Sequence, residues 1–103
     1  MNIKNYVGIE SLEVKFGPMT VALYIKSFRE ADEISQTEFA KKLKISRANL
    51  CDIEKGRKLL SAERAAKFAK YIKVPEVVLI KLALQDLLRE AQLNYQIELK
   101  KVA

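Results

Sequence analysis

The feature that most constrains this chain is the close spacing, between residues 20 and 75, of residues that typically begin or end a helix. Four hydroxyl residues each stand before a run with helical spacing of apolar side chains, where they can cap the first turn: Thr20, Ser35, Ser46 and Ser61. Ser35 and Glu38 form a capping box, in which the hydroxyl accepts a backbone N–H and the glutamate reaches back. Gly56 ends the third run. These signals predict helices over residues 21–31, 36–43, 47–55 and 62–72, and a fifth from Pro75 to about residue 93.

The predicted fold class is therefore all-α, with a five-helix domain over residues 20–93. An N-terminal extension covers residues 1–19 and a C-terminal tail covers 94–103. The tail has the period of a β-strand, because apolar residues alternate with polar ones: Tyr95, Ile97 and Leu99. In the N-terminal extension Leu12, Val14 and Phe16 alternate as in a strand, but a helix fits equally well through Ile9, Leu12 and Phe16. A tail strand has three candidate partners, namely the N-terminal extension, its twin in a dimer, and another protein.

Composition excludes most catalytic chemistry. The 103 residues contain no histidine, so there is no imidazole base and no histidine metal ligand. The single Cys51 forms no internal disulfide, which favours a reducing cytoplasm. The most apolar stretch, residues 74–84, has only eleven residues and carries two charges, too short to span a membrane. We expect a protein that is not an enzyme and needs no cofactor or metal.

The net charge of +6 is confined to one block. Residues 20–75 hold 13 basic and 7 acidic side chains, whereas residues 1–19 and 76–103 are each neutral. Within the block, residues 41–58 carry seven basic and two acidic residues. A basic block indicates nucleic acid or another anionic partner, although such a run by itself also suits a solvated helix face.

The two short helices predicted over 36–43 and 47–55 have the spacing of a helix-turn-helix unit. Ala40 is small enough for the helices to cross closely, and Ile45 fills the turn from inside. The solvent side of the second helix then presents four side chains to a DNA major groove: Arg47, Ala48, Asn49 and Asp52. The spacing alone fits any compact helical bundle as well.

Residues 25–74 resemble the Cro/lambda-repressor family of helix-turn-helix domains, also called the Xre family. The resemblance runs through three segments above all: Ser35-Gln36-Thr37-Glu38-Phe39-Ala40, Leu43 to Ser46, and Ile53-Glu54-Lys55-Gly56-Arg57. It implies a lambda-repressor-like fold and sequence-specific binding to double-stranded DNA. At the turn this chain has Lys44 where the family usually has glycine, and a left-handed non-glycine residue costs about 1 kcal/mol.

The resemblance also implies roles for single residues. Gln36 contacts a DNA phosphate and supports the recognition helix. Bases are read by Arg47, Ala48 and Asp52, with Ser46 and Asn49 at the edge. Backbone phosphate is held by the side chains and N–H groups of Lys55, Gly56 and Arg57. Arg29 and Glu54 form a partly buried ion pair.

Side-chain chemistry refines these roles and leaves some alternatives open. Arg47 can donate two hydrogen bonds to guanine O6 and N7, or contact phosphate instead. Ala48 is either a contact for a thymine methyl group or a spacer. Asp52 either accepts from a cytosine N4 or pairs with Arg47. Other cations in the block contribute diffuse electrostatics: Lys41, Lys42, Lys58 and Arg64. Cys51 is expected to be a half-buried filler.

The fifth predicted helix is apolar on more than one side. One face is expected to cover the core: Val77, Ile80, Leu84, Leu87, Leu88 and Ala91. A second apolar set is expected to form a homodimer contact: Val78, Leu79, Leu82 and Ala83. Such a dimer reads a palindromic operator as two half-sites about 34 Å apart.

The sequence thus predicts a cytoplasmic DNA-binding regulator that represses by occupying an operator. A short chain with a helical body and a brief tail resembles the antitoxins of toxin–antitoxin pairs, whose second partner is a toxin protein. The alternatives are a stand-alone or phage-type repressor, and a protein-interaction module that uses the fold without DNA.

Overall fold

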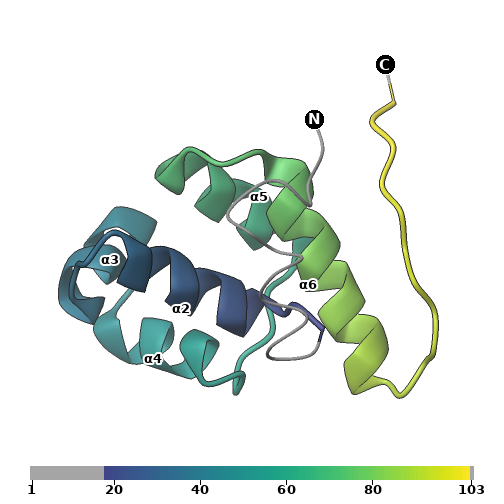
Figure 1. The fold of residues 1–103 in the computed structure, drawn as a ribbon, viewed down its shortest axis with the longest axis horizontal. Coiled ribbons are helices and arrows are strands. Elements are labelled where there is room, and N and C mark those ends of the chain that lie inside the picture. Colours follow the sequence, from purple (N-terminus) through teal and green to yellow (C-terminus); the bar gives the residue numbers. More distant parts are fainter. Residues whose placement is uncertain (1–17, 103) are drawn as a thin grey trace.

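The computed structural model describes residues 18–102, which form five helices (Figure 1). These are α2 (Val21–Ala31), α3 (Gln36–Leu43), α4 (Arg47–Glu54), α5 (Ala62–Ile72) and α6 (Glu76–Glu90). The all-α prediction is confirmed, and only α6 ends clearly earlier than predicted. Residues 94–102 run beside α6 without a strand partner in the described chain, so the tail strand is not formed there (Figure 1). The alternating residues Leu12, Val14 and Phe16 lie outside the described residues.

Local capping explains where the helices begin. In α2, α3, α4 and α5 a hydroxyl oxygen accepts the N–H three residues on, at 3.1 Å in each case: Thr20, Ser35, Ser46 and Ser61. One part of the capping-box prediction is wrong, because Glu38 makes no return bond to Ser35. The Glu38 side chain is exposed instead.

All five helices end at a residue with a left-handed backbone. The φ angle is 55° at Glu33, 60° at Lys44, 74° at Gly56, 61° at Lys73 and 59° at Gln92. At each end the N–H of this residue bonds to the carbonyl three residues back, and the next N–H bonds to the carbonyl five residues back. This pair of bonds is the Schellman arrangement. The left-handed Lys44 is therefore present as predicted, and only one of the five helix ends uses glycine.

The core collects apolar side chains from every described helix. Tyr24 and Ile25 of α2, Phe39 of α3, Leu50 of α4 and Phe68 of α5 are all buried in it. Phe28 lies between Tyr24 and Phe39, with ring centroids 6.3 Å and 6.0 Å away. The α5 and α6 helices pack against each other, and α6 also contacts α2.

The face that α6 turns to the core differs in part from the predicted one: Val77 and Ile80 of the predicted set do pack, half-buried, against the core. Val78, Leu79 and Ala83 are at most 1% exposed within a single chain, so the prediction that they form a dimer contact is wrong. Leu82 of the same set also packs against the core. Leu87, which was expected inside, is 42% exposed. Both sides of α6 are apolar, so its own periodicity does not identify the buried one, and packing against α5 decides.

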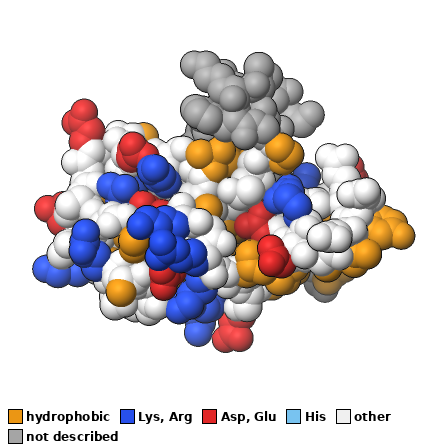
Figure 2. Space-filling view, turned by 90° about the horizontal axis from the view of Figure 1, so that it is seen from below, with side chains coloured by type: hydrophobic (Ala, Val, Ile, Leu, Met, Phe, Trp, Pro, Cys, Tyr) orange, Lys and Arg blue, Asp and Glu red, His pale blue; other side chains and the backbone are white. Residues whose placement is uncertain are grey.

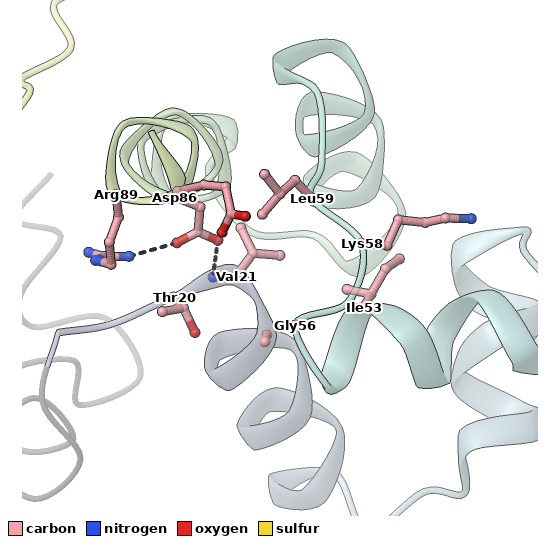
Figure 3. A pocket seen from close by; sticks show the side chains of 10 residues that line it. Thr20, Val21, Ile53, Gly56, Lys58, Leu59, Asp86 and Arg89 are labelled. Atoms are coloured by element: carbon pink, nitrogen blue, oxygen red, sulfur yellow. Dashed lines mark hydrogen bonds and ion pairs between the residues drawn. The ribbon is translucent and has the colours of Figure 1, made fainter. Parts of the chain in front are cut away.

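Asp86 ties α6 to the start of α2 (Figure 3). Its Oδ2 accepts the Val21 N–H at 3.1 Å, and its Oδ1 accepts from Arg89 at 3.0 Å. Burial raises the pKa of Asp86, and the bonds from Val21 and Arg89 offset this only in part. The adjoining pocket is also lined by Gly56 and Lys58, so α6 lies next to the loop that follows α4.

Candidate nucleic-acid interface

The turn between α3 and α4 is held from both sides. Ala40 is 2% exposed, and its carbonyl accepts the Ile45 N–H at 3.0 Å. Ile45 itself is half-buried and packs against the core. On the outside, the Lys44 Nζ lies 4.7 Å from the centroid of the Tyr71 ring, a cation–π contact with α5. These contacts fix the angle at which α4 leaves α3.

One side of α4 is buried and the opposite side is open. Leu50 and Ile53 are at most 1% exposed, and Glu54 is also buried. The remaining side holds the residues predicted to read DNA. Ser46, Arg47 and Ala48 are exposed, whereas Asn49 and Asp52 are half-buried: the helix therefore presents the predicted set to solvent as one continuous face.

An ion pair holds the end of α4. The Arg29 Nε and Nη2 donate to the two carboxylate oxygens of Glu54 at 2.7 Å and 3.0 Å, as the resemblance implies. Arg29 also donates to the Ile34 carbonyl at 3.1 Å, and Gln36 donates to Glu54 at 3.1 Å. One carboxylate thus joins α2, α3 and α4, and these three helices keep a common orientation.

The charge of Glu54 survives burial because of these donors. Burial by itself raises the pKa of Glu54, but the hydrogen bonds from Arg29 and Gln36 and the Arg29 charge outweigh it. The net result is a pKa below the ordinary value. The hydrogen bond to Glu54 raises the pKa of Arg29 in turn. Both groups therefore stay ionised.

The loop after α4 offers cationic side chains. Lys55, Arg57 and Lys58 are exposed, and a Cβ added at Gly56 would meet nothing within 4 Å. The backbone differs from what the resemblance implies, because the N–H groups of residues 55, 56 and 57 already donate to carbonyls of α4. Any phosphate contact from these three positions must therefore come from the side chains of Lys55 and Arg57, since Gly56 has none.

Two loop cations bind the outward polar residues of α4. Lys58 Nζ donates to the Asn49 Oδ1 at 2.8 Å. Arg57 lies 3.5 Å from Asp52, so the expected alternative partner, Arg47, is not the one observed. The role of Lys58 was missed in the sequence, because nine positions and a turn separate it from Asn49. Only its place directly after the Gly56 turn hinted at such a contact.

Comparison with known proteins identifies the family. A helix-turn-helix family model matches residues 25–79, just over half of the chain. The protein belongs to the Cro/lambda-repressor-like, or Xre, family. Neither a curated protein nor a solved structure matches the chain. The match makes this Xre protein a DNA-binding transcription regulator.

On the face drawn in Figure 2, most cationic and most hydrophobic side chains lie at different ends of this Xre protein. Figure 2 shows Lys and Arg side chains grouped toward the end of the molecule where α3 and α4 lie, and hydrophobic side chains at the opposite end. Among residues 18–102, no three His, Cys, Asp or Glu side chains come together as metal ligands. No described helix is long and apolar enough to cross a membrane.

Proposed function

We propose that this Xre protein is a dimeric repressor that binds a palindromic operator. Each copy places α4 in the major groove of one half-site, and the half-sites are about 34 Å apart. The observation that carries the proposal is the open face of α4, which starts with exposed Arg47 and Ala48 and is flanked by exposed cations. The ion pair of Glu54 with Arg29 holds that face in a fixed orientation.

Base reading is assigned to the first turns of α4. Arg47 is exposed and has no carboxylate partner in the described chain, so its guanidinium is available for guanine O6 and N7. Ala48 is exposed beside it and suits a thymine methyl group. Asp52 meets the cytosine N4 once DNA draws Arg57 away, because their 3.5 Å contact is exposed and weak. Ser46 lies at the edge of this set.

Asn49 acts as a hydrogen-bond donor in this scheme. A lysine ammonium only donates, so the oxygen of Asn49 must face Lys58, and the Nδ2 hydrogens remain for DNA. A guanine edge offers two acceptors, whereas adenine requires an acceptor and a donor together. Asn49 therefore favours guanine over adenine at the base pair it reaches.

Phosphate contacts are assigned to residues around α4. Gln36 uses one Nε2 hydrogen for Glu54, which leaves the other for a phosphate oxygen. Lys55 and Arg57 contribute charged side chains. Gly56 contributes by lacking a side chain, since the space where its Cβ would lie is open for the DNA backbone.

The test is binding to the DNA upstream of the protein's own gene, measured by gel shift over a range of salt concentrations. We expect binding that weakens steeply with salt, because phosphate contacts release counterions. Arg47→Ala should abolish sequence preference, whereas Arg57→Ala should weaken binding to all sequences alike. Absence of any shift at low salt overturns DNA binding, and equal loss of specificity in both variants overturns the division of roles.

We further propose that the repressor is the autoregulating antitoxin of a toxin–antitoxin pair and acts in the cytoplasm. The short helical body with a brief tail supports this over a stand-alone or phage-type repressor. Co-expression with the neighbouring gene distinguishes them: an antitoxin rescues growth from a toxic neighbour, and a lone repressor does not. A pure protein-interaction module would rescue growth without shifting DNA.

A further inference from the structure

The Gln85 side chain of α6 forms two hydrogen bonds with the backbone of the tail. The Gln85 Nε2 donates to the Tyr95 carbonyl at 2.6 Å, and the Gln85 Oε1 accepts the Ile97 N–H at 3.0 Å. Ile97 and Leu99 are half-buried, whereas Glu98 and Lys100 are exposed. This alternation agrees with the extended course of the tail beside α6 in Figure 1.

Because both bonds fall on odd-numbered residues, they use only one edge of the extended tail. In an extended chain, residues two apart direct their N–H and C=O groups to the same edge. The other edge carries the backbone groups of four even-numbered residues, which have no hydrogen-bond partner within the described chain: Gln96, Glu98, Lys100 and Val102. An open edge of this kind is a template for a further strand.

The surroundings of this edge favour a second copy of the same chain. Four of the five large hydrophobics exposed in residues 18–102 lie on the last turns of α6 and the tail: Leu87, Leu93, Tyr95 and Val102. Residues 76–103 are neutral overall, whereas residues 20–75 carry the entire +6. Two copies can therefore approach through the tail without bringing their basic faces into contact.

Charge selects one register for such pairing. If two tails pair antiparallel through their open edges with Leu99 opposite Leu99, each Glu98 lies opposite a Lys100. The two neighbouring registers that keep the same edges facing are centred one residue earlier or later. They place Glu98 opposite Glu98, or Lys100 opposite Lys100. We propose that the C-terminal tails of two copies form an antiparallel two-stranded ribbon in this register, which joins the dimer while Gln85 holds each tail on its own α6. The proposal specifies how the dimer of the proposed function is built and rests on that dimer.

Charge reversal tests the register. Sedimentation equilibrium without DNA would compare wild type with Glu98→Lys, Lys100→Glu and the double exchange. Each single variant should weaken self-association at least about tenfold, because two like-charged pairs replace two opposite ones. The double exchange should restore wild-type association. Glu98→Lys raises the net charge from +6 and Lys100→Glu lowers it, so weakening by both excludes a net-charge effect. Glu90→Lys, the same change on α6 outside the tail, is the matched control and should leave association unchanged.

Disulfide trapping provides a second readout. In a Cys51→Ser background, Leu99→Cys should give a crosslinked dimer on mild oxidation with diamide, because residues 99 face each other at a close, non-hydrogen-bonded pair. Ile97→Cys should not, since residue 97 lies opposite Lys101 in this register. A monomeric wild type, single reversals without effect, or equal crosslinking at both positions would overturn the ribbon. Binding of the variants to a single half-site duplex reports on DNA recognition alone, so loss there would count against the proposed function instead.

Discussion

The ends of α3 and α4 have the same backbone arrangement, but the side chain that follows points into the core in one case and to solvent in the other. After α3, left-handed Lys44 is followed by Ile45, which packs against the core. After α4, left-handed Gly56 is followed by Arg57, whose side chain is 63% exposed. The same two hydrogen bonds therefore direct one residue inward and one outward. The difference lies in the residue types alone.

The other helix ends show which of the two is unusual. An apolar residue also follows the left-handed position after α2, α5 and α6, namely Ile34, Val74 and Leu93. Such a residue commonly makes a hydrophobic contact that secures the helix end. The end of α4 lacks it and is secured by Glu54 through Arg29 and Gln36. The helix that we propose to enter the DNA groove is thus held by charge, and the residue that follows its left-handed end stays exposed.

The largest predicted effect concerns that charge. Glu54→Ala should lower the free energy of unfolding by about 3–5 kcal/mol, because it leaves Arg29 as an uncompensated, mostly buried cation. Urea unfolding followed by circular dichroism measures it. The apolar replacement of both partners, Arg29→Met with Glu54→Leu, should recover most of the loss. If Glu54→Ala costs less than Ile45→Ala, α4 is not held mainly by charge.

The same ion pair predicts a pH dependence. The pKa of Glu54 is lowered in the folded protein, so its contribution is complete above the ordinary value of 4.5 and is lost as pH falls through the folded pKa. The stability difference between wild type and Glu54→Gln should therefore shrink in acid.

The pH dependence expected from Asp86 has the opposite sign. Its pKa is raised in the folded protein, so the ionised carboxylate destabilises the fold and protonation removes that cost. Asp86→Asn should gain relative to wild type as pH rises, and urea midpoints at several pH values decide both.

At the end of α3, the predicted loss of stability is smaller and comes from removing an apolar contact. Ile45→Ala should cost about 1–2 kcal/mol, less than for a fully buried isoleucine because Ile45 is half-buried. Arg57→Ala is its counterpart after α4 and should change stability by no more than about 0.5 kcal/mol, while weakening DNA binding. Unfolding and gel-shift experiments on both variants measure these effects. A larger loss of stability for Arg57→Ala than for Ile45→Ala would contradict the comparison of the two helix ends.

Effects of up to about 1 kcal/mol are expected at the left-handed residues. Gly56→Ala should cost about 1 kcal/mol from backbone strain alone, since the added Cβ meets nothing within 4 Å. Lys44→Gly should relieve that strain and leave stability unchanged or raised by up to about 1 kcal/mol. Lys44→Ala is the control for loss of the Tyr71 contact without change of backbone class. Thermal unfolding measures the stability of all three variants. Equal losses of stability for Gly56→Ala and Lys44→Gly would contradict the strain argument.

The starts of the helices were predictable because a hydroxyl cap acts within three residues of itself. Most of their ends were also predicted, and only α6 stops clearly earlier; what the sequence did not show is the left-handed backbone of Glu33, Lys73 and Gln92, which lack the glycine that signals it. The buried face of α6 could not be predicted, because Val78 and Ile80 are equally apolar and only contact with α5 distinguishes them. At the interface, the resemblance indicated the outward residues of α4, but side-chain pairs formed across the loop have no periodic signal.

The two faces of α4 also bear on how this protein can change its target. Leu50 and Ile53 on the buried side belong to the core, whereas Arg47 and Ala48 are exposed. Substitutions at those two positions should therefore lower the free energy of unfolding only slightly, and it is loss of this free energy that makes most mutations harmful. Under the proposed base reading, new sequence preferences are therefore accessible by single substitutions that leave the scaffold intact. The same separation makes α4 a suitable place to redesign sequence preference by randomising its exposed positions.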